Sequence, residues 1–175
     1  LNILLSNDLT VELESNFFKL FDIPQQFFVN ERELKKRSRE LLRRCHPDLY
    51  VNASAQERRL AVQYSAQVNQ GYEVLLDPIK RAQHLMSLAG IATDEQRTVG
   101  DTGFLIEQMA LREALEEARD ADDLAALAEL KQRVEQSFSA SQQSFAEAES
   151  SDTQLFAIAK MQFFDKLKRE LADAA

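Results

Sequence analysis

Residues that form turns, bridges and metal clusters are scarce in this 175-residue sequence, which has four Gly, three Pro, one Cys and no Trp. Proteins rich in strands need frequent turn residues and β-branched runs, so this scarcity favours helices. The single cysteine, Cys45, excludes an internal disulfide and supplies no thiolate cluster for a metal. We therefore expect an almost entirely helical protein of a reducing compartment, with no cofactor.

Long apolar runs are lacking as well. No stretch approaches the roughly 20 apolar residues of a membrane span, and the opening LNILLSN is too short and lacks the basic flank of a signal peptide. Residue 1 is Leu rather than Met, so the sequence leaves open whether a targeting segment precedes it. We expect no membrane partner, and the bacterial cytoplasm rather than a mitochondrial matrix as the compartment.

A surplus of positive charge is also missing, because the net charge is −8. Residues 1–80 hold 11 Lys and Arg against 11 Asp and Glu, whereas residues 81–175 hold 10 against 18. Nucleic-acid binding draws on counterion release and needs a positive surface. A basic stretch over 32–44 resembles a recognition helix, but no tight Gly-containing turn follows it. We expect no nucleic-acid partner.

The first half of the chain predicts a hairpin of two long helices. Asn30 followed by Glu33, and Ser54 followed by Glu57, are capping-box patterns that begin a helix over 31–45 and a second one after the loop HPDLYVNA. Both are amphipathic and the loop is short, which favours an antiparallel pair with a short helix from SNFFKLFDIP laid across it. The short helix is predicted to bury Phe17, Leu20 and Phe21 and to end at Pro24. The long helices are predicted to bury Leu34, Leu41, Leu42 and Cys45, and Leu60, Tyr64, Val68, Tyr72 and Leu75.

The second half predicts further helices. Asp77 and Pro78 read as an N-cap and first helical residue of a helix that ends before Gly90. Three more helices are expected over 102–119, 123–147 and 153–172, joined by short connections. Their predicted interior residues are Leu105, Met109, Leu124, Leu127, Val134, Phe138, Phe145, Phe156, Phe163, Phe164, Leu167 and Leu171. The predicted fold class is all-α, a helical hairpin with a short helix joined to a C-terminal three-helix bundle.

The helix over 31–45 stops at His46, Pro47 and Asp48. A histidine beside an aspartate suggests a base and its orienting group, but a hydrolase also needs a nucleophile and oxyanion donors around a pocket. A metal site has only His46 and His84 available, with no Cys/His cluster. We therefore predict no enzyme and no metal site.

Protein recognition fits this loop better. The preceding helix has a cationic face that can steer an acidic partner, and Asp48 can accept a bidentate hydrogen bond from a partner arginine. The residues of that face are Arg32, Lys35, Lys36, Arg39 and Arg43.

These patterns resemble a known family. The tripeptide HPD, preceded by ERELKKRSRELLRRC and followed by a helix ending VNQGYEVLLDPIKRA, resembles a J-domain, the module through which co-chaperones activate 70-kDa heat-shock ATPases. The later segments TVGDTGFLIEQMALREALEEA and KMQFFDKLKREL are similar to the HscB family, J-proteins devoted to iron-sulfur cluster biogenesis.

The resemblance implies a J-domain over 15–80, a connecting helix and linker over 81–101, and a scaffold-binding domain over 102–175. It implies that His46, Pro47 and Asp48, together with the cationic face, dock on an HscA-like chaperone and trigger its ATPase. The C-terminal bundle would hold an IscU-type iron-sulfur scaffold and deliver it to the chaperone. A J-protein that serves a different client is the alternative.

Carried over from the family, the scaffold-binding positions are Leu105, Ile106, Met109, Glu113, Glu117 and Phe163. Leu105 and Met109 fit the core of the bundle equally well, because apolar residues at helical spacing are usually buried. The chain departs from the family pattern in three places. Leu49 stands where J-domains usually have lysine, Ala110 where the family can carry a carboxylate, and Gly71 where alanine is usual.

Overall fold

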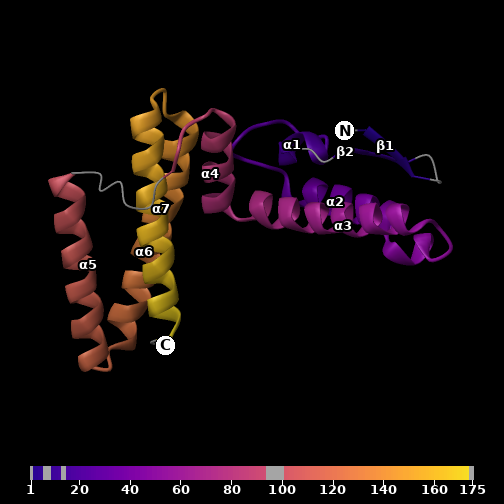
Figure 1. The fold of residues 1–175 in the computed structure, drawn as a ribbon. Coiled ribbons are helices and arrows are strands. Elements are labelled where there is room, and N and C mark those ends of the chain that lie inside the picture. Colours follow the sequence, from indigo (N-terminus) through magenta and orange to yellow (C-terminus); the bar gives the residue numbers. More distant parts are fainter. Residues whose placement is uncertain (1, 6–8, 13–14, 94–100, 174–175) are drawn as a thin grey trace. The chain divides into compact units, whose positions relative to one another are not determined.

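The protein is described by a computed structural model that covers residues 2–5, 9–12, 15–93 and 101–173. The chain divides into two compact units, unit 1 (Leu1–Leu88) and unit 2 (Ala89–Ala175), each with its own core (Figure 1). Helices form both cores, so the all-α prediction is confirmed. A pair of short strands, β1 (Asn2–Leu5) and β2 (Leu9–Glu12), adds an antiparallel hairpin that the sequence patterns did not predict.

Unit 1 is a helical hairpin with shorter elements around it. Its order is α1 (Phe17–Leu20), α2 (Glu31–Cys45), the 3₁₀ turn η1 (Pro47–Tyr50), α3 (Ala55–Leu76) and α4 (Pro78–Leu88). Helix α2 packs along α3, and α1 and α4 both contact α3 (Figure 1). This arrangement is the predicted antiparallel helical hairpin with a short helix against it. Helix α4, which the sequence patterns set apart as a connecting element, falls within this unit.

The helix starts follow from capping side chains. Ser54 and Glu57 form a complete capping box, in which the Ser54 hydroxyl accepts from the Glu57 N–H and the Glu57 carboxylate accepts from the Ser54 N–H at 2.9 Å. Asn30 caps α2 in the same way, but Glu33 pairs with Arg37 at 3.5 Å instead of reaching back. The Asp77 carboxylate accepts from the first free N–H groups of α4, as predicted.

The prediction for α1 was confirmed for Phe21, but it missed Phe18 and overstated the burial of Phe17 and Leu20. The helix makes a single turn that ends before Pro24, and Phe18 and Phe21 are its fully buried residues, whereas Phe17 and Leu20 are half-buried. One turn contains too few residues for periodicity to fix its buried face. Phe17 and Phe21 instead lie against Gly71, where a Cβ would come within 2.8 Å and 3.0 Å of their rings. Gly71 is thus the close approach between α1 and α3.

Unit 2 is a three-helix bundle of α5 (Thr102–Asp120), α6 (Leu124–Glu147) and α7 (Ser151–Ala172). Helix α6 packs along α7 and also contacts α5. The fully buried residues of unit 2 include most of the residues that were predicted to be buried in α6 and α7. These are Leu127, Val134, Phe138, Phe145, Phe164, Leu167 and Leu171.

The predicted interior of unit 2 was wrong at Leu124, and Leu105 and Met109, which fitted core and interface equally well, belong to the surface. Leu105, Met109 and Leu124 are exposed, at 56%, 65% and 69%. Helix α5 turns Phe104, Leu111, Leu115 and Ala118 inward, a face one residue away from the predicted one. Adjacent residues differ by about 100° around a helix, which is enough to move a side chain from core to surface. Phe156 and Phe163 are half-buried between core and surface.

Two candidate docking surfaces

The His46–Asp48 loop lies between two buried anchors. Cys45 and Tyr50 are fully buried, while His46 and Asp48 are exposed between them. The Tyr50 hydroxyl donates to the carbonyl of Arg44 at 3.1 Å, and the Ser65 hydroxyl of α3 donates to the carbonyl of Cys45 at 3.1 Å. These contacts fix both ends of the loop to the hairpin, so it presents two polar side chains from a rigid base.

Within the loop, the imidazole of His46 faces Asp48. Its Nδ1 accepts a hydrogen bond from the Asp48 N–H at 3.4 Å and lies 3.5 Å from the Asp48 carboxylate. This nitrogen caps the 3₁₀ turn, and the carboxylate lies beside the ring. The thiol of Cys45 is buried, which raises its pKa, so it offers no nucleophile to this pair. The arrangement suits recognition rather than attack on a substrate.

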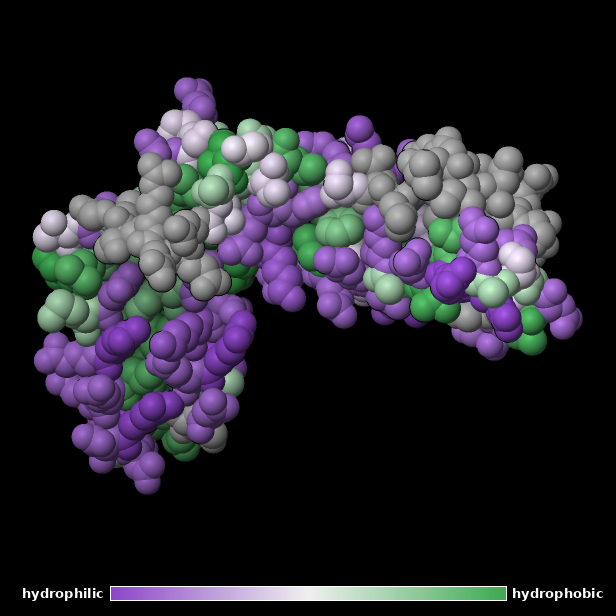
Figure 2. All heavy atoms as spheres, in the orientation of Figure 1, coloured by the Kyte–Doolittle hydropathy of each residue, from purple (hydrophilic) through white to green (hydrophobic). Residues whose placement is uncertain are grey.

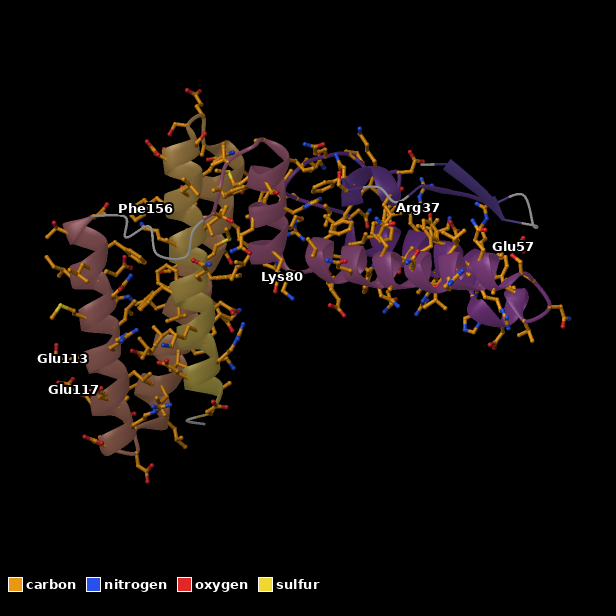
Figure 3. The ribbon with its side chains drawn as sticks, viewed as in Figure 1. Arg37, Glu57, Lys80, Glu113, Glu117 and Phe156 are labelled. Atoms are coloured by element: carbon orange, nitrogen blue, oxygen red, sulfur yellow. The ribbon has the colours of Figure 1, made fainter. Side chains whose placement is uncertain are left out.

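All five residues of the predicted cationic face of α2 are exposed. Among them, Lys36 lies 3.9 Å from Glu40 of the same helix. Arg37, on an adjacent side of α2, instead contacts Asp22 at 3.4 Å as well as Glu33, and so ties α2 to the turn after α1 (Figure 3). The face and the loop adjoin at a groove of about 480 Å³. It is lined by Arg39, Leu42, Arg43, His46 and Leu49. Sequence reasoning placed Leu42 in the core and noted Leu49 only as a departure from the family.

In unit 2, α5 carries an exposed apolar stripe. Leu105, Ile106 and Met109 are 56%, 62% and 65% exposed, which decides against a core role for Leu105 and Met109. Figure 2 shows hydrophobic residues on the surface at the N-terminal end of α5. Glu113 and Glu117 are also exposed, on the side of α5 away from α6 and α7 (Figure 3). We call these five residues the α5 stripe.

Phe163 comes from α7 and lies within an aromatic cluster rather than in the α5 stripe. Its ring centroid is 5.6 Å from that of Phe104, which also contacts Phe156 at 5.6 Å in an edge-to-face arrangement. Arg112 of α5 covers Phe163, with its guanidinium carbon 5.8 Å from the ring centroid. The structure thus gathers the predicted α5 residues on one helix and places Phe163 under an arginine that sequence reasoning missed.

His46 and His84, the two histidines weighed as metal ligands, have different surroundings. His84 stacks on Phe17 with ring centroids 4.8 Å apart, and its Nε2 accepts from the Phe17 N–H at 3.2 Å. Across the residues that the structure describes, no group of three or more His, Cys, Asp or Glu is placed to hold a metal ion. Over the same residues, no helix is long and apolar enough to cross a membrane.

A helical hairpin whose connecting loop carries His46, Pro47 and Asp48 is the arrangement of a J-domain protein, and the comparisons narrow the class. A family model described as the HSCB C-terminal oligomerisation domain matches residues 100–172. The co-chaperone protein HscB homolog of Shewanella loihica is 43% identical over 170 residues, which are 91% of this chain and 96% of that protein. The chain therefore belongs to the HscB family of co-chaperones.

Solved structures of HscB proteins also match this chain. The chaperone HscB from Vibrio cholerae matches with a TM-score of 0.82 at 38% identity, over 90% of this chain and 96% of that one. Human co-chaperone HscB matches with a TM-score of 0.84 at 28% identity, over 93% of this chain and 83% of that one.

Proposed function

We propose that this co-chaperone binds an HscA-like 70-kDa heat-shock ATPase through unit 1, stimulates its ATP hydrolysis, and delivers an IscU-type iron-sulfur scaffold bound to unit 2. The chain hydrolyses nothing itself in this proposal. The observation that carries it is the exposed His46–Asp48 pair on a loop held by buried Cys45 and Tyr50, at the end of a cationic helix. Such a loop presents a carboxylate at a defined position to a partner arginine at little entropic cost.

The α5 stripe supports the second half of the proposal. Exposed apolar residues flanked by carboxylates form a surface with an apolar centre and a charged edge, which is the usual anatomy of a protein interface. We assign chaperone docking to residues 15–80 and scaffold binding to residues 102–175, with 81–101 between them. The relative from Shewanella loihica is bacterial, and a bacterial cytoplasm stays the expected compartment.

Single-turnover ATP hydrolysis by an HscA-like chaperone tests the proposal. The measurement compares the wild-type protein, Asp48→Ala and Glu73→Ala, each with and without the scaffold. Glu73 is the matched control because it is an exposed carboxylate on α3 outside the loop. We expect Asp48→Ala to lose stimulation and Glu73→Ala to keep it, because only Asp48 belongs to the trigger.

The comparison of measurements with and without the scaffold separates the two candidate functions. Stimulation that depends on Asp48 and increases synergistically with the scaffold supports both halves of the proposal. Stimulation that depends on Asp48 without synergy favours a J-protein for a different client. Full stimulation by Asp48→Ala contradicts the assignment of the trigger.

A further inference from the structure

The groove at the end of α2 combines apolar walls with cationic edges. Leu42 and Leu49 face it from α2 and from the 3₁₀ turn, and Arg39, Arg43 and His46 complete its lining. Leu49 is 55% exposed although its backbone is fixed, since its N–H donates to the carbonyl of His46 at 2.9 Å. An aliphatic side chain is therefore held in solvent beside the trigger loop rather than packed in the core.

The chemistry of this lining selects one kind of occupant. Apolar walls favour an aliphatic or aromatic side chain, because its burial removes apolar surface from water. The two arginines at the edges favour carboxylates, which a guanidinium binds in a bidentate geometry. A protein segment with an apolar side chain flanked by Asp or Glu satisfies both requirements. The charge complementarity extends along α2, where the remaining residues of the cationic face are also exposed.

We infer that this groove binds an apolar side chain of an acidic segment on the ATPase that the His46–Asp48 loop stimulates. The inference rests on the proposed function and assigns binding affinity and ATPase stimulation to different residues of unit 1. Leu49 and Leu42 contribute affinity by apolar contact, whereas Asp48 contributes the trigger. Removing the contact therefore changes how much co-chaperone is needed, while removing the trigger changes how much stimulation is reached.

Leu49 is the better position to test. Leu42 packs against the core of unit 1, so its substitution also lowers stability. Leu49→Ser removes the apolar contact from an exposed position, and Leu49→Met keeps an apolar side chain of similar size. Val62→Ser is the matched control, because Val62 is 53% exposed on α3 and does not line the groove.

The experiment titrates each variant against an HscA-like chaperone and measures both the half-maximal concentration and the maximal rate of ATP hydrolysis. We expect Leu49→Ser to raise the half-maximal concentration about tenfold with an unchanged maximum. Leu49→Met and Val62→Ser should stay within about twofold of the wild type. Asp48→Ala in the same series reports on the proposed function by itself, because that variant leaves the groove intact.

The outcomes separate the two claims. If Leu49→Ser behaves like Val62→Ser while Asp48→Ala loses stimulation, the groove is not an affinity site and the proposed function stands. If Asp48→Ala keeps full stimulation, the proposed function fails. Light scattering of the chain alone tests a second copy as the occupant. A self-associated mass in the wild type that Leu49→Ser reduces to the monomer would overturn the inference.

Discussion

The hydroxyl of Tyr50 donates a hydrogen bond to the carbonyl of Arg44 at 3.1 Å and so joins the two ends of the His46–Asp48 loop. Tyr50 is fully buried. The carbonyl belongs to the last turn of α2, where no intrahelical N–H remains to satisfy it. One side chain therefore caps a helix end and closes the loop that carries the candidate trigger.

Replacing Tyr50 with Phe keeps the ring and removes only this bond. We expect Tyr50→Phe to lower the free energy of unfolding by about 1 kcal/mol, the usual net value of one hydrogen bond. Urea unfolding followed by circular dichroism measures this change. Tyr72→Phe, at the half-buried ring of α3, is the control and should have a smaller effect. Equal effects for the two variants would show that the loop closure contributes no stability.

The cationic face of α2 predicts an effect of charge on association rate. Lys35→Glu combined with Arg39→Glu reverses two exposed charges on this face. Long-range attraction between exposed charges is screened by salt, so we expect association with an HscA-like chaperone to slow about tenfold at low ionic strength and much less at high ionic strength. Stopped-flow mixing at several salt concentrations measures the rates.

The matched control changes the same charge in the other unit. Lys131→Glu combined with Arg133→Glu alters the net charge equally at two exposed positions of α6. This control should leave the association rate nearly unchanged. If both pairs slow association to the same extent, net charge rather than the α2 face steers the encounter.

Sequence patterns predicted the helices well because their signals are local. The capping residues and proline positions fixed the starts of α3 and α4, and the loop at His46 followed from the proline. Sequence patterns failed where contacts between distant parts of the chain determine the role of a residue. Gly71 was noted only as a departure from the alanine that is usual in the family, yet it is the site where two phenylalanine rings approach α3. No local signal records that contact.

The candidate sites show the same division. The residues of the cationic face and of the loop were predicted from spacing, since exposure of charged residues on an amphipathic helix is the rule. The status of Leu105 and Met109 was open, because an apolar residue at helical spacing fits either a core or an interface. In the structure Phe104 faces the core of unit 2, and its neighbour Leu105 is therefore exposed. The strands β1 and β2 have four residues each, too few for an alternating pattern to predict them.

The α5 stripe predicts a loss of scaffold binding without a loss of stability. Ile106→Ala combined with Met109→Ala removes two exposed apolar side chains. We expect affinity for an IscU-type scaffold to fall about tenfold or more, because the buried area at the interface shrinks. Isothermal titration calorimetry measures the affinity. These positions are better probes than Phe163, whose ring contacts Phe104 within the fold.

The control for this pair is Leu124→Ala. Leu124 is 69% exposed on the same bundle, at the start of α6, and lies outside the stripe. The thermal unfolding midpoint should remain near that of the wild type in both proteins, and scaffold affinity should change only for the stripe variant. An unchanged affinity in the stripe variant would place the scaffold site elsewhere.

His84 predicts a dependence of stability on pH. Its Nε2 accepts from the Phe17 N–H, and burial lowers the pKa of His84 below its usual 6.5. The unfolded state therefore binds a proton more readily than the folded state. The stabilising contribution is present above about pH 6.5 and decreases as the pH falls through the unfolded-state pKa.

Urea unfolding of the wild type at pH 7.5 and pH 5 should show this decrease, and His84→Gln should reduce the difference between the two conditions. Glutamine keeps an acceptor for the Phe17 N–H but does not titrate. The variant therefore separates the effect of protonating His84 from the effect of its hydrogen bond. His46→Gln is the control, because His46 is exposed in the loop and lies outside the core. If His84→Gln retains the full decrease, the titrating group that destabilises the fold at low pH is not His84, and the stack on Phe17 acts by packing alone.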